Sequence, residues 1–173
     1  MPPQIDHRNK AVSSFIPKHS FLNRFISASD YHDAYSIDVS HLPPLDPPSA
    51  LKLIAERYPR WVLLFLRLRK IFFSRWGMTN PLEGVPTDFS SLDFSVNSKI
   101  GNFLVAESTP FELILNYTDP HFVAHVGIIL NQGHRQAILA STAKFTDNFG
   151  KVYFLLTKPA HQLIFKSLLN SLR

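Results

Sequence analysis

Histidine pairs are the first candidates for metal chemistry, because the chain has no cysteine and so no thiolate ligand, disulfide or cysteine nucleophile. His121 and His125 lie four residues apart in the segment HFVAH. The surrounding alternation predicts a strand, on which two such residues are about 13 Å apart. That distance is too long for both to bind one ion. The sequence therefore predicts no metal site, and no cofactor is expected.

A second polar group consists of Asp30, His32 and Asp33 in the segment SDYHD. Such residues are common in turns, where their side chains hydrogen-bond to nearby backbone groups. This capping role is favoured over catalysis. His161 could act as a general base, although histidines near a helix are more often capping or solvated residues. Tyr153 is expected to be a core aromatic residue with its hydroxyl at the rim.

Motifs that would identify an enzyme are missing from the sequence. None of HExxH, GxSxG, the P-loop or GxGxxG occurs, so peptidase, serine hydrolase, nucleotide and dinucleotide functions lack their usual support. The catalytic residues stay unknown, and the sequence favours a protein that is not an enzyme. Nucleic acid is not expected as a partner, because the basic residues are not joined to a known reading motif.

The composition fits one globular domain. The chain has 173 residues, of which 45% are hydrophobic, with 15 Phe, 5 Tyr and 2 Trp, so a single bulky aromatic core is expected. Residues 1–20 contain no continuous apolar segment, which predicts a flexible N-terminal tail and a domain over residues 21–173. The net charge of +5 permits weak attraction to anionic surfaces.

The first structured segments are a strand and two helices. AYSIDVS alternates apolar and polar residues as a half-buried strand does. After a proline cluster, Ser49 could cap a helix that starts near Ala50 and ends near Pro59. A second helix is predicted over residues 60–75, and Gly77 ends it.

The predicted helix over residues 60–75 has an apolar face and a basic one. Its apolar face comprises Trp61, Leu64, Phe65, Leu68, Ile71 and Phe72, and its cations are Arg60, Arg67, Arg69, Lys70 and Arg75. The apolar stretch is shorter than the roughly 20 residues of a spanning helix, so a soluble, cytoplasmic protein is expected. The helix either buries its apolar face in the domain or docks on an anionic membrane surface or an acidic protein.

The pattern from Phe89 to Thr146 predicts about five antiparallel strands with one wet face. These are LDFSVN, FLVAE, PFELILNYT and a hairpin formed by the runs 121–130 and 135–146. The C-terminal segment then predicts one long helix that Pro159 kinks so that it follows a curved sheet, rather than two short helices. Its concave side is expected to carry Val152, Tyr153, Leu156, Ala160, Leu163 and Ile164.

This order predicts an α+β helix-grip fold, in which a curved antiparallel sheet of about six strands wraps a long C-terminal helix and two helices follow the first strand. The segments DYHDAYSIDV, YPRWVLLFLRLRKIFFSRWGM, IGNFLVAESTPFELILN, DPHF and FGKVYFLLTKPAHQLI resemble a bacterial family, domain-of-unknown-function family 2867. Its members look like small relatives of the START and polyketide-cyclase superfamily. That resemblance implies a cavity for an apolar ligand and carries no catalytic residues.

The resulting hypothesis is a cavity between sheet and final helix that binds a small, mostly apolar or lipid-like molecule. The expected ligand-binding residues are Phe111, Leu113, Tyr117, Ala124, Val126, Ser141, Tyr153, Leu156 and His161. The alternative interpretation is that the small residues on this face let the helix pack closely against the sheet and leave no cavity. The alternatives in function are an adaptor that docks through the basic helix over residues 60–75, and a cyclase- or hydrolase-like enzyme that uses the same cavity.

Overall fold

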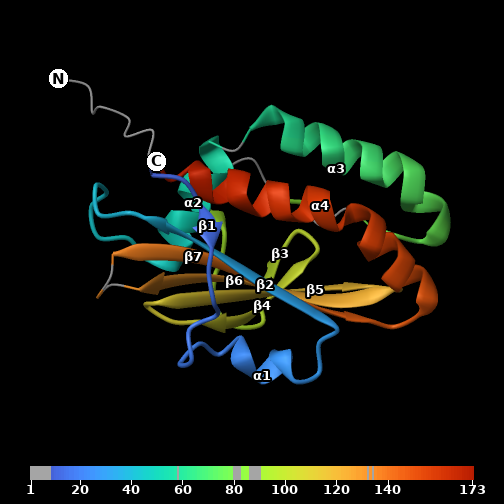
Figure 1. The fold of residues 1–173 in the computed structure, drawn as a ribbon, viewed down its shortest axis with the longest axis horizontal. Helices are drawn as coiled ribbons and strands as arrows, with labels where there is room; N and C mark the ends of the chain where they lie inside the picture. The colour runs from blue at the N-terminus through green and yellow to red at the C-terminus, as the bar shows by residue number, and fades with distance from the viewer. Residues whose placement is uncertain (1–8, 58, 80–82, 86–90, 132, 134) are drawn as a thin grey trace.

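The computed structural model describes residues 9–57, 59–79, 83–85, 91–131, 133 and 135–173. It is an α+β helix-grip fold in which one antiparallel sheet carries the three longer helices on one face and a short helix on the other (Figure 1). The strands are β1 Val12–Ser13, β2 Tyr31–Asp38, β3 Lys99–Ile100, β4 Phe103–Ser108, β5 Glu112–Asp119, β6 Phe122–Asn131 and β7 Gln136–Phe145. The helices are α1 Asn23–Ile26, α2 Pro47–Arg57, α3 Arg60–Phe73, the 3-10 turn η1 Ser74–Trp76, and α4 Asn148–Asn170.

The sheet has seven strands in the order β1-β2-β7-β6-β5-β4-β3, one more than the six or so expected. Strands β3 to β7 follow one another as hairpins, and β2 pairs with β7 across the whole of its length. The prediction of a strand at Leu92–Val96 is wrong. There the Asp93 carboxylate accepts hydrogen bonds from the amide and hydroxyl of Ser95, both at 2.8 Å, and such local bonds favour a turn over a ladder.

Both faces of the central strands are covered. The helix-facing side packs Tyr35, Ile128 and Leu139 against Phe165 and Leu169 of α4. The opposite side, on which α1 and the segment before it lie, packs a smaller cluster around Leu22, Ile114 and Ile138. The prediction of one solvent-exposed face is therefore wrong for the middle of the sheet, because the N-terminal segment covers that face.

That N-terminal segment overlaps the stretch expected to be a tail. Val12 and Ser13 pair with β2. The Ser20 hydroxyl and the Phe21 amide donate hydrogen bonds to the buried Glu112 carboxylate, at 2.5 and 2.9 Å. Part of residues 1–20 therefore belongs to the packed domain, and Glu112 is satisfied inside it.

Helix α2 begins earlier than the sequence pattern suggested. The Asp46 carboxylate accepts a hydrogen bond from the Ser49 amide at 2.7 Å, so Asp46 takes the capping position assigned to Ser49. Pro47 is then the first helical residue, where its missing amide costs nothing. Ala50 and Ile54 bury this helix against the sheet.

Helix α4 is one helix that continues through Pro159, as predicted, and Figure 1 shows it bending over the sheet. Asp147 caps it by accepting a hydrogen bond from the Gly150 amide at 2.7 Å. Pro159 leaves the carbonyl of Leu155 without its helical donor. Leu155 lies in solvent, where water can supply that bond.

The orientation of α4 differs from the one predicted. Tyr153 does lie inward, but Val152, Leu156 and Leu163 are 57%, 70% and 56% exposed. Helix α4 rests on the sheet through Phe165 and Leu169 instead. The helix is apolar on two sides, and periodicity alone could not tell which side meets the sheet.

This orientation leads to a matched pair of stability predictions. Leu169→Ala should lower the free energy of unfolding by about 2 to 5 kcal/mol, because it opens a cavity beneath α4. Leu163→Ala, on the outer side of the same helix, should change it by less than about 0.5 kcal/mol. Chemical denaturation of the two variants would measure both values. Equal losses would contradict this placement of α4.

Candidate docking face and the polar clusters beneath it

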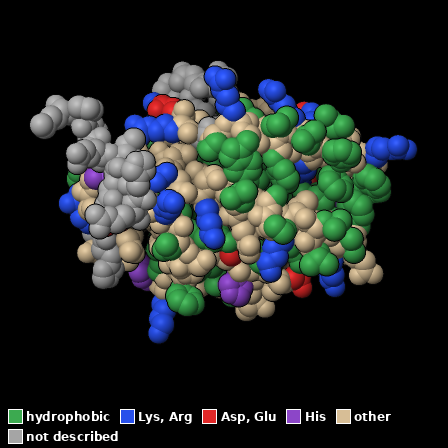
Figure 2. Space-filling model, turned by 45° about the horizontal axis from the view of Figure 1, so that its top comes forward, with side chains coloured by type: hydrophobic (Ala, Val, Ile, Leu, Met, Phe, Trp, Pro, Cys, Tyr) green, Lys and Arg blue, Asp and Glu red, His purple; other side chains and the backbone are tan. Residues whose placement is uncertain are grey.

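Helices α3 and α4 expose an unusual amount of apolar surface. The exposed side chains are Trp61, Leu64, Leu68, Ile71 and Phe72 on α3, Trp76 on η1, and Val152, Leu155, Leu156 and Leu163 on α4. We call these residues the docking face. Figure 2 shows hydrophobic side chains gathered on the side of the molecule that carries α3 and α4. Contiguous apolar patches of this kind mark interaction sites on soluble proteins.

The helical segments that carry the docking face contain positive charges and no negative ones. The segments Arg60–Trp76 and Asn148–Asn170 contain no aspartate or glutamate. Arg67, Arg75 and Lys151 are exposed. Lysine and arginine side chains border the apolar area in Figure 2. Among the described helices, none is long and apolar enough to cross a membrane.

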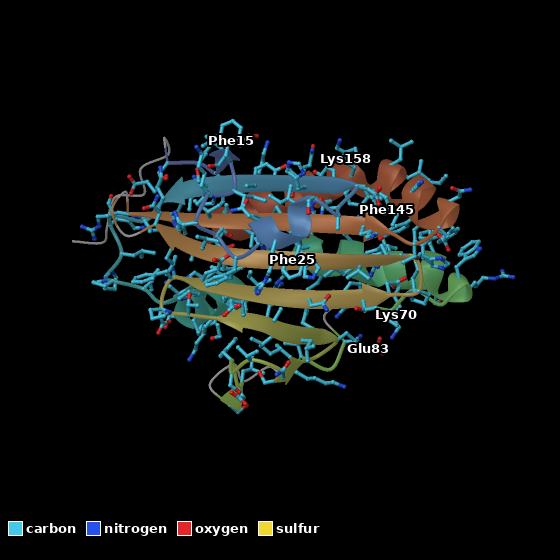
Figure 3. All side chains as sticks on the ribbon, turned by 90° about the horizontal axis from the view of Figure 1, so that it is seen from below. Phe15, Phe25, Lys70, Glu83, Phe145 and Lys158 are labelled. Carbon is cyan, nitrogen blue, oxygen red and sulfur yellow. The ribbon has the colours of Figure 1, made fainter. Side chains whose placement is uncertain are left out.

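Of the described cations on α3 and η1, Lys70 is the one with an acidic partner. Lys70 forms an ion pair with Glu83 at 2.9 Å, which Figure 3 shows at the edge of the sheet. Within the described residues, Arg67 and Arg75 make no ion pair. The docking face therefore combines exposed apolar side chains with uncompensated positive charge.

Arg69 is the exception among the basic residues of α3. It was expected on the solvated basic side, but it is 8% exposed, so that expectation is wrong. Its Nε donates a hydrogen bond to the Tyr153 hydroxyl, and a terminal nitrogen donates to the Thr79 carbonyl at 2.7 Å. The Tyr117 hydroxyl bonds the same carbonyl at 2.8 Å. Arg69 thus joins α3 to α4 and, through Thr79, to β5.

The sequence contained a signal for this arrangement. Val62, Arg69 and Phe73 lie on one side of α3 at helical spacing. Val62 and Arg69 are buried, and the Phe73 ring meets the Tyr153 ring at 4.9 Å. The helix thus has two apolar sides. The side that contains Arg69 faces the domain, and the side that contains Leu64 and Leu68 faces solvent.

His121 contacts both the turn η1, which follows α3, and the capping residue at the start of α4. His121 Nδ1 lies 2.7 Å from a carboxylate oxygen of Asp147, and Nε2 lies 2.7 Å from the carbonyl of Trp76. Both partners are hydrogen-bond acceptors, so the protonated imidazole, which donates from both ring nitrogens, is the form that satisfies both contacts. The Asp147 carboxylate, the Trp76 carbonyl and the nearby Asp119 carboxylate all raise the pKa of His121.

The contacts of His121 predict that the stability of the protein depends on pH. Because the folded-state pKa of His121 lies above the ordinary value of about 6.5, its stabilising effect is complete below that value and is lost as the pH rises through the folded-state pKa. The free energy of unfolding should therefore fall over this window. His121→Gln should remove that part of the fall when the two proteins are denatured at a series of pH values. An unchanged pH profile in the variant would contradict the assignment.

The predicted ligand-binding residues divide into two groups. Leu113, Tyr117, Ala124, Val126 and Ser141 lie on the helix-facing side of the sheet, where Tyr117 pairs with Ala124 and Val126 with Ser141. Two others do not line the space under α4. Phe111 is 50% exposed just before β5, and Leu156 is 70% exposed on the outer side of α4. Both side chains therefore lie away from the space under α4, because strand alternation does not extend to Phe111 and Leu156 is on the outer side of the helix.

Aromatic rings occupy the space between the sheet and the first half of α4. The Phe122 ring stacks on that of Tyr153 with ring centres 6.0 Å apart, and its centre lies 5.8 Å from that of Tyr117.

Two pockets lie in other parts of the molecule. One, of about 310 Å³, is at the end of the sheet beside the loop 39–45, and the other, of about 320 Å³, is beneath the segment 14–16.

His161, the last predicted site residue, belongs to a polar cluster under α4. Ser141 Oγ donates to Asp33 Oδ1 at 2.6 Å, Tyr31 donates to Asp33 Oδ2 at 2.8 Å, and His161 Nε2 lies 3.3 Å from Ser141 Oγ. Burial would raise the pKa of Asp33, but hydrogen bonds from His161, Ser141 and Tyr31 outweigh it and hold that pKa below the ordinary value.

The cluster resembles a catalytic triad in residue types only. In a triad, the two nitrogens of the histidine separately contact the serine and the carboxylate. Here Nε2 of His161 faces both Ser141 and Asp33, and the serine proton goes to the carboxylate. Ser141 is also 3% exposed, so a substrate cannot reach it. The cluster therefore fastens α4 to β2 and β7, and the SDYHD segment contributes Asp33 to it.

The remaining histidine of the HFVAH segment lies apart from these groups. His125 stacks on Phe25 of α1 with ring centres 3.7 Å apart, on the sheet face opposite α4. Burial, with a smaller effect from Arg24, lowers the pKa of His125 and favours its neutral form. His121 and His125 thus have unrelated surroundings and separate structural roles.

Comparisons with known proteins identify a family. Searches of curated proteins and of solved structures found no match. A family model described as a protein of unknown function, DUF2867, matches residues 25–168. That range runs from α1 almost to the end of α4 and includes every element of the docking face. The chain therefore belongs to the DUF2867 family.

Proposed function

We propose that the protein is a peripheral membrane-binding protein whose docking face lies on anionic lipid. The observation that carries this proposal is the exposed apolar surface of α3 and α4, which has exposed cations beside it and no acidic residue on either helix. An amphipathic helix with leucine, phenylalanine and tryptophan on one side and basic residues beside them binds at the interface between head groups and acyl chains. Trp61 and Trp76 suit that interface because the indole ring is amphipathic.

An acidic protein partner is the other candidate for this surface. A protein interface needs a partner surface whose shape and charge match it at its core. A lipid surface needs only buried apolar area and attraction to negative charge. The composition of the docking face is therefore accounted for more simply by lipid.

Vesicle sedimentation tests the proposal directly. The protein should sediment with vesicles that contain phosphatidylglycerol and should bind much less to vesicles of phosphatidylcholine alone. Binding should weaken as salt is added, because exposed charges are screened within about 8 Å at physiological ionic strength. Equal and negligible binding to both vesicles would exclude a lipid surface and leave an acidic protein as the partner.

A small apolar ligand beneath α4 is the second candidate. Small side chains at Ala124 and Ala143 face one another on the helix side of the sheet, and they support this candidate together with the resemblance to START-like proteins. Mass spectrometry of gently purified protein should then detect an apolar adduct that Ala124→Trp removes. Conversion of that molecule would indicate an enzyme of cyclase or hydrolase type.

A further inference from the structure

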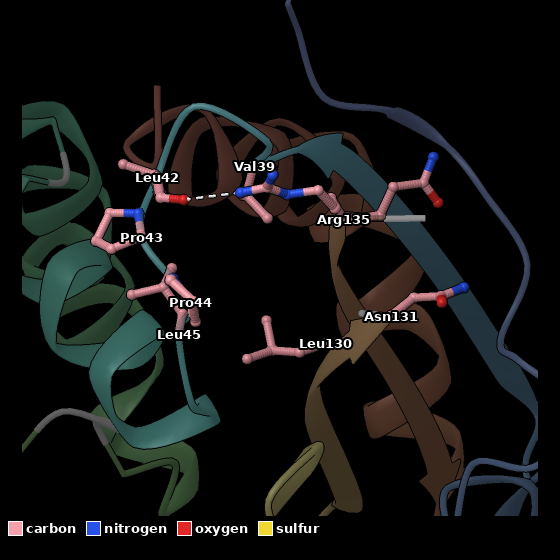
Figure 4. A pocket seen from close by; sticks show the side chains of 9 residues that line it. Val39, Leu42, Pro43, Pro44, Leu45, Leu130, Asn131 and Arg135 are labelled. Carbon is pink, nitrogen blue, oxygen red and sulfur yellow. Dashed lines mark hydrogen bonds between the residues drawn. The ribbon is translucent and has the colours of Figure 1, made fainter. Parts of the chain in front are cut away.

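A pocket at the end of the sheet has a composition different from that of the docking face. The residues that line it are Val39, Leu42, Pro43, Pro44, Leu45, Leu130, Asn131, Arg135 and Gln136. Figure 4 shows Leu130 reaching from the end of β6 toward the proline loop, and the Arg135 side chain extending across the gap to the Leu42 carbonyl. The volume of about 310 Å³ is at the small end of the range for ligand sites.

The walls of this pocket are largely fixed before any ligand binds. Pro43 and Pro44 have restricted backbone dihedral angles and present no amide donors. The Val39 amide donates a hydrogen bond to the Arg135 carbonyl at 2.8 Å. The guanidinium of Arg135 donates to the Leu42 carbonyl at 3.2 Å. These two bonds join the loop to the end of β7, so the pocket does not have to be assembled by its ligand.

Arg135 has an unusual backbone. Its φ of 49° lies in the left-handed region, which residues other than glycine adopt at a cost. Residues in this region occur in turns and also at ligand sites. Here this conformation accompanies a guanidinium held at the edge of an apolar pocket, with one of its five N–H donors bonded to Leu42.

One carboxylate lies near this arginine. Asp38 is exposed, and Ser40, more than His41 or Arg135, lowers its pKa. Asp38 accepts a hydrogen bond from the Ser40 amide at 2.6 Å. No ion pair between Asp38 and Arg135 forms in the described part of the chain, so the guanidinium keeps donors for another anion.

We propose that this end pocket binds a small monocarboxylate with a short apolar chain. Leu42, Leu45 and Leu130 would contact the chain, and Arg135 would bind the carboxylate through charge-assisted hydrogen bonds. The ligand could be a free short-chain fatty acid or the C-terminus of a peptide that ends in an apolar residue. The proposal is independent of the docking face, which lies on α3 and α4.

Binding of hexanoate, followed by NMR chemical shifts of the full chain, tests the proposal. Millimolar hexanoate should shift signals of Val39, Leu45 and Leu130, and hexan-1-ol should bind at least about tenfold more weakly because it lacks the charge. Arg135→Met should reduce hexanoate affinity about tenfold or more, whereas Arg67→Met on the docking face should leave it unchanged. Asp38→Asn should strengthen binding slightly by removing a nearby negative charge.

Two further measurements complete the test. Leu45→Trp should fill the pocket and abolish binding of hexanoate without changing sedimentation with vesicles. A hexapeptide that ends in leucine, compared with its C-terminal amide, separates a peptide ligand from a fatty acid. Equal affinity for hexanoate and hexan-1-ol, unchanged binding in Arg135→Met, or no binding at millimolar hexanoate would each overturn the proposal.

Discussion

Replacing Ile71 and Leu155 together with glutamate should abolish sedimentation with phosphatidylglycerol vesicles. These are two of the most exposed apolar residues of α3 and α4, at 68% and 72%. Burying one such side chain contributes about 1.5 to 3 kcal/mol, so losing two should weaken binding by more than about 100-fold. The new carboxylates would also be repelled by anionic head groups.

A matched control separates the docking face from exposed apolar surface in general. Phe15 is 89% exposed, and Figure 3 shows it on the N-terminal segment, seen from the side opposite the docking face. Phe15→Glu should therefore bind vesicles as the unchanged protein does. Retained binding in the double variant, or an equal loss in Phe15→Glu, would contradict docking through α3 and α4. Both variants should unfold at the same denaturant concentration as the parent, because the replaced side chains lie in solvent.

Arg69→Ala should be among the most destabilising single changes on α3. It removes two charge-assisted hydrogen bonds, one to the buried Tyr153 hydroxyl and one to the part-buried Thr79 carbonyl. Hydrogen bonds to charged groups contribute about 1.5 to 3 kcal/mol each, so a loss of about 3 kcal/mol in the free energy of unfolding is expected. Chemical denaturation measures it.

Arg67 supplies the control for this change, since it lies two residues away on the exposed side of the same helix. Arg67→Ala should alter the free energy of unfolding by no more than about 0.5 kcal/mol but should weaken binding to anionic vesicles. The two variants thus distinguish a loss of stability, expected for Arg69→Ala, from a loss of vesicle binding, expected for Arg67→Ala. A stability loss shared equally by both variants would mean that α3 does not turn Arg69 inward.

The candidate sites were harder to predict than the elements that carry them. Alternation placed Tyr117, Ala124 and Ser141 on the same side of the sheet, since side-chain direction in a strand follows from position. It could not show that the rings of Phe122 and Tyr153 occupy the space above them. The contact of His121 with Trp76 and Asp147 joins three segments distant in the chain, and no local pattern indicates it.

The sequence by itself determined the α+β class, the order of the main elements, the hairpin of β6 and β7, and one C-terminal helix that continues through Pro159. These features depend on local periodicity, turn residues and capping, which each segment contains in its own residues. Only the tertiary structure decided which side of α3 and α4 meets the domain. Both helices are apolar on two sides, so burial of either side is locally acceptable. The choice depends on Arg69, Tyr153, Phe165 and Leu169 finding partners in distant segments, and that choice leaves the leucines of the docking face in solvent.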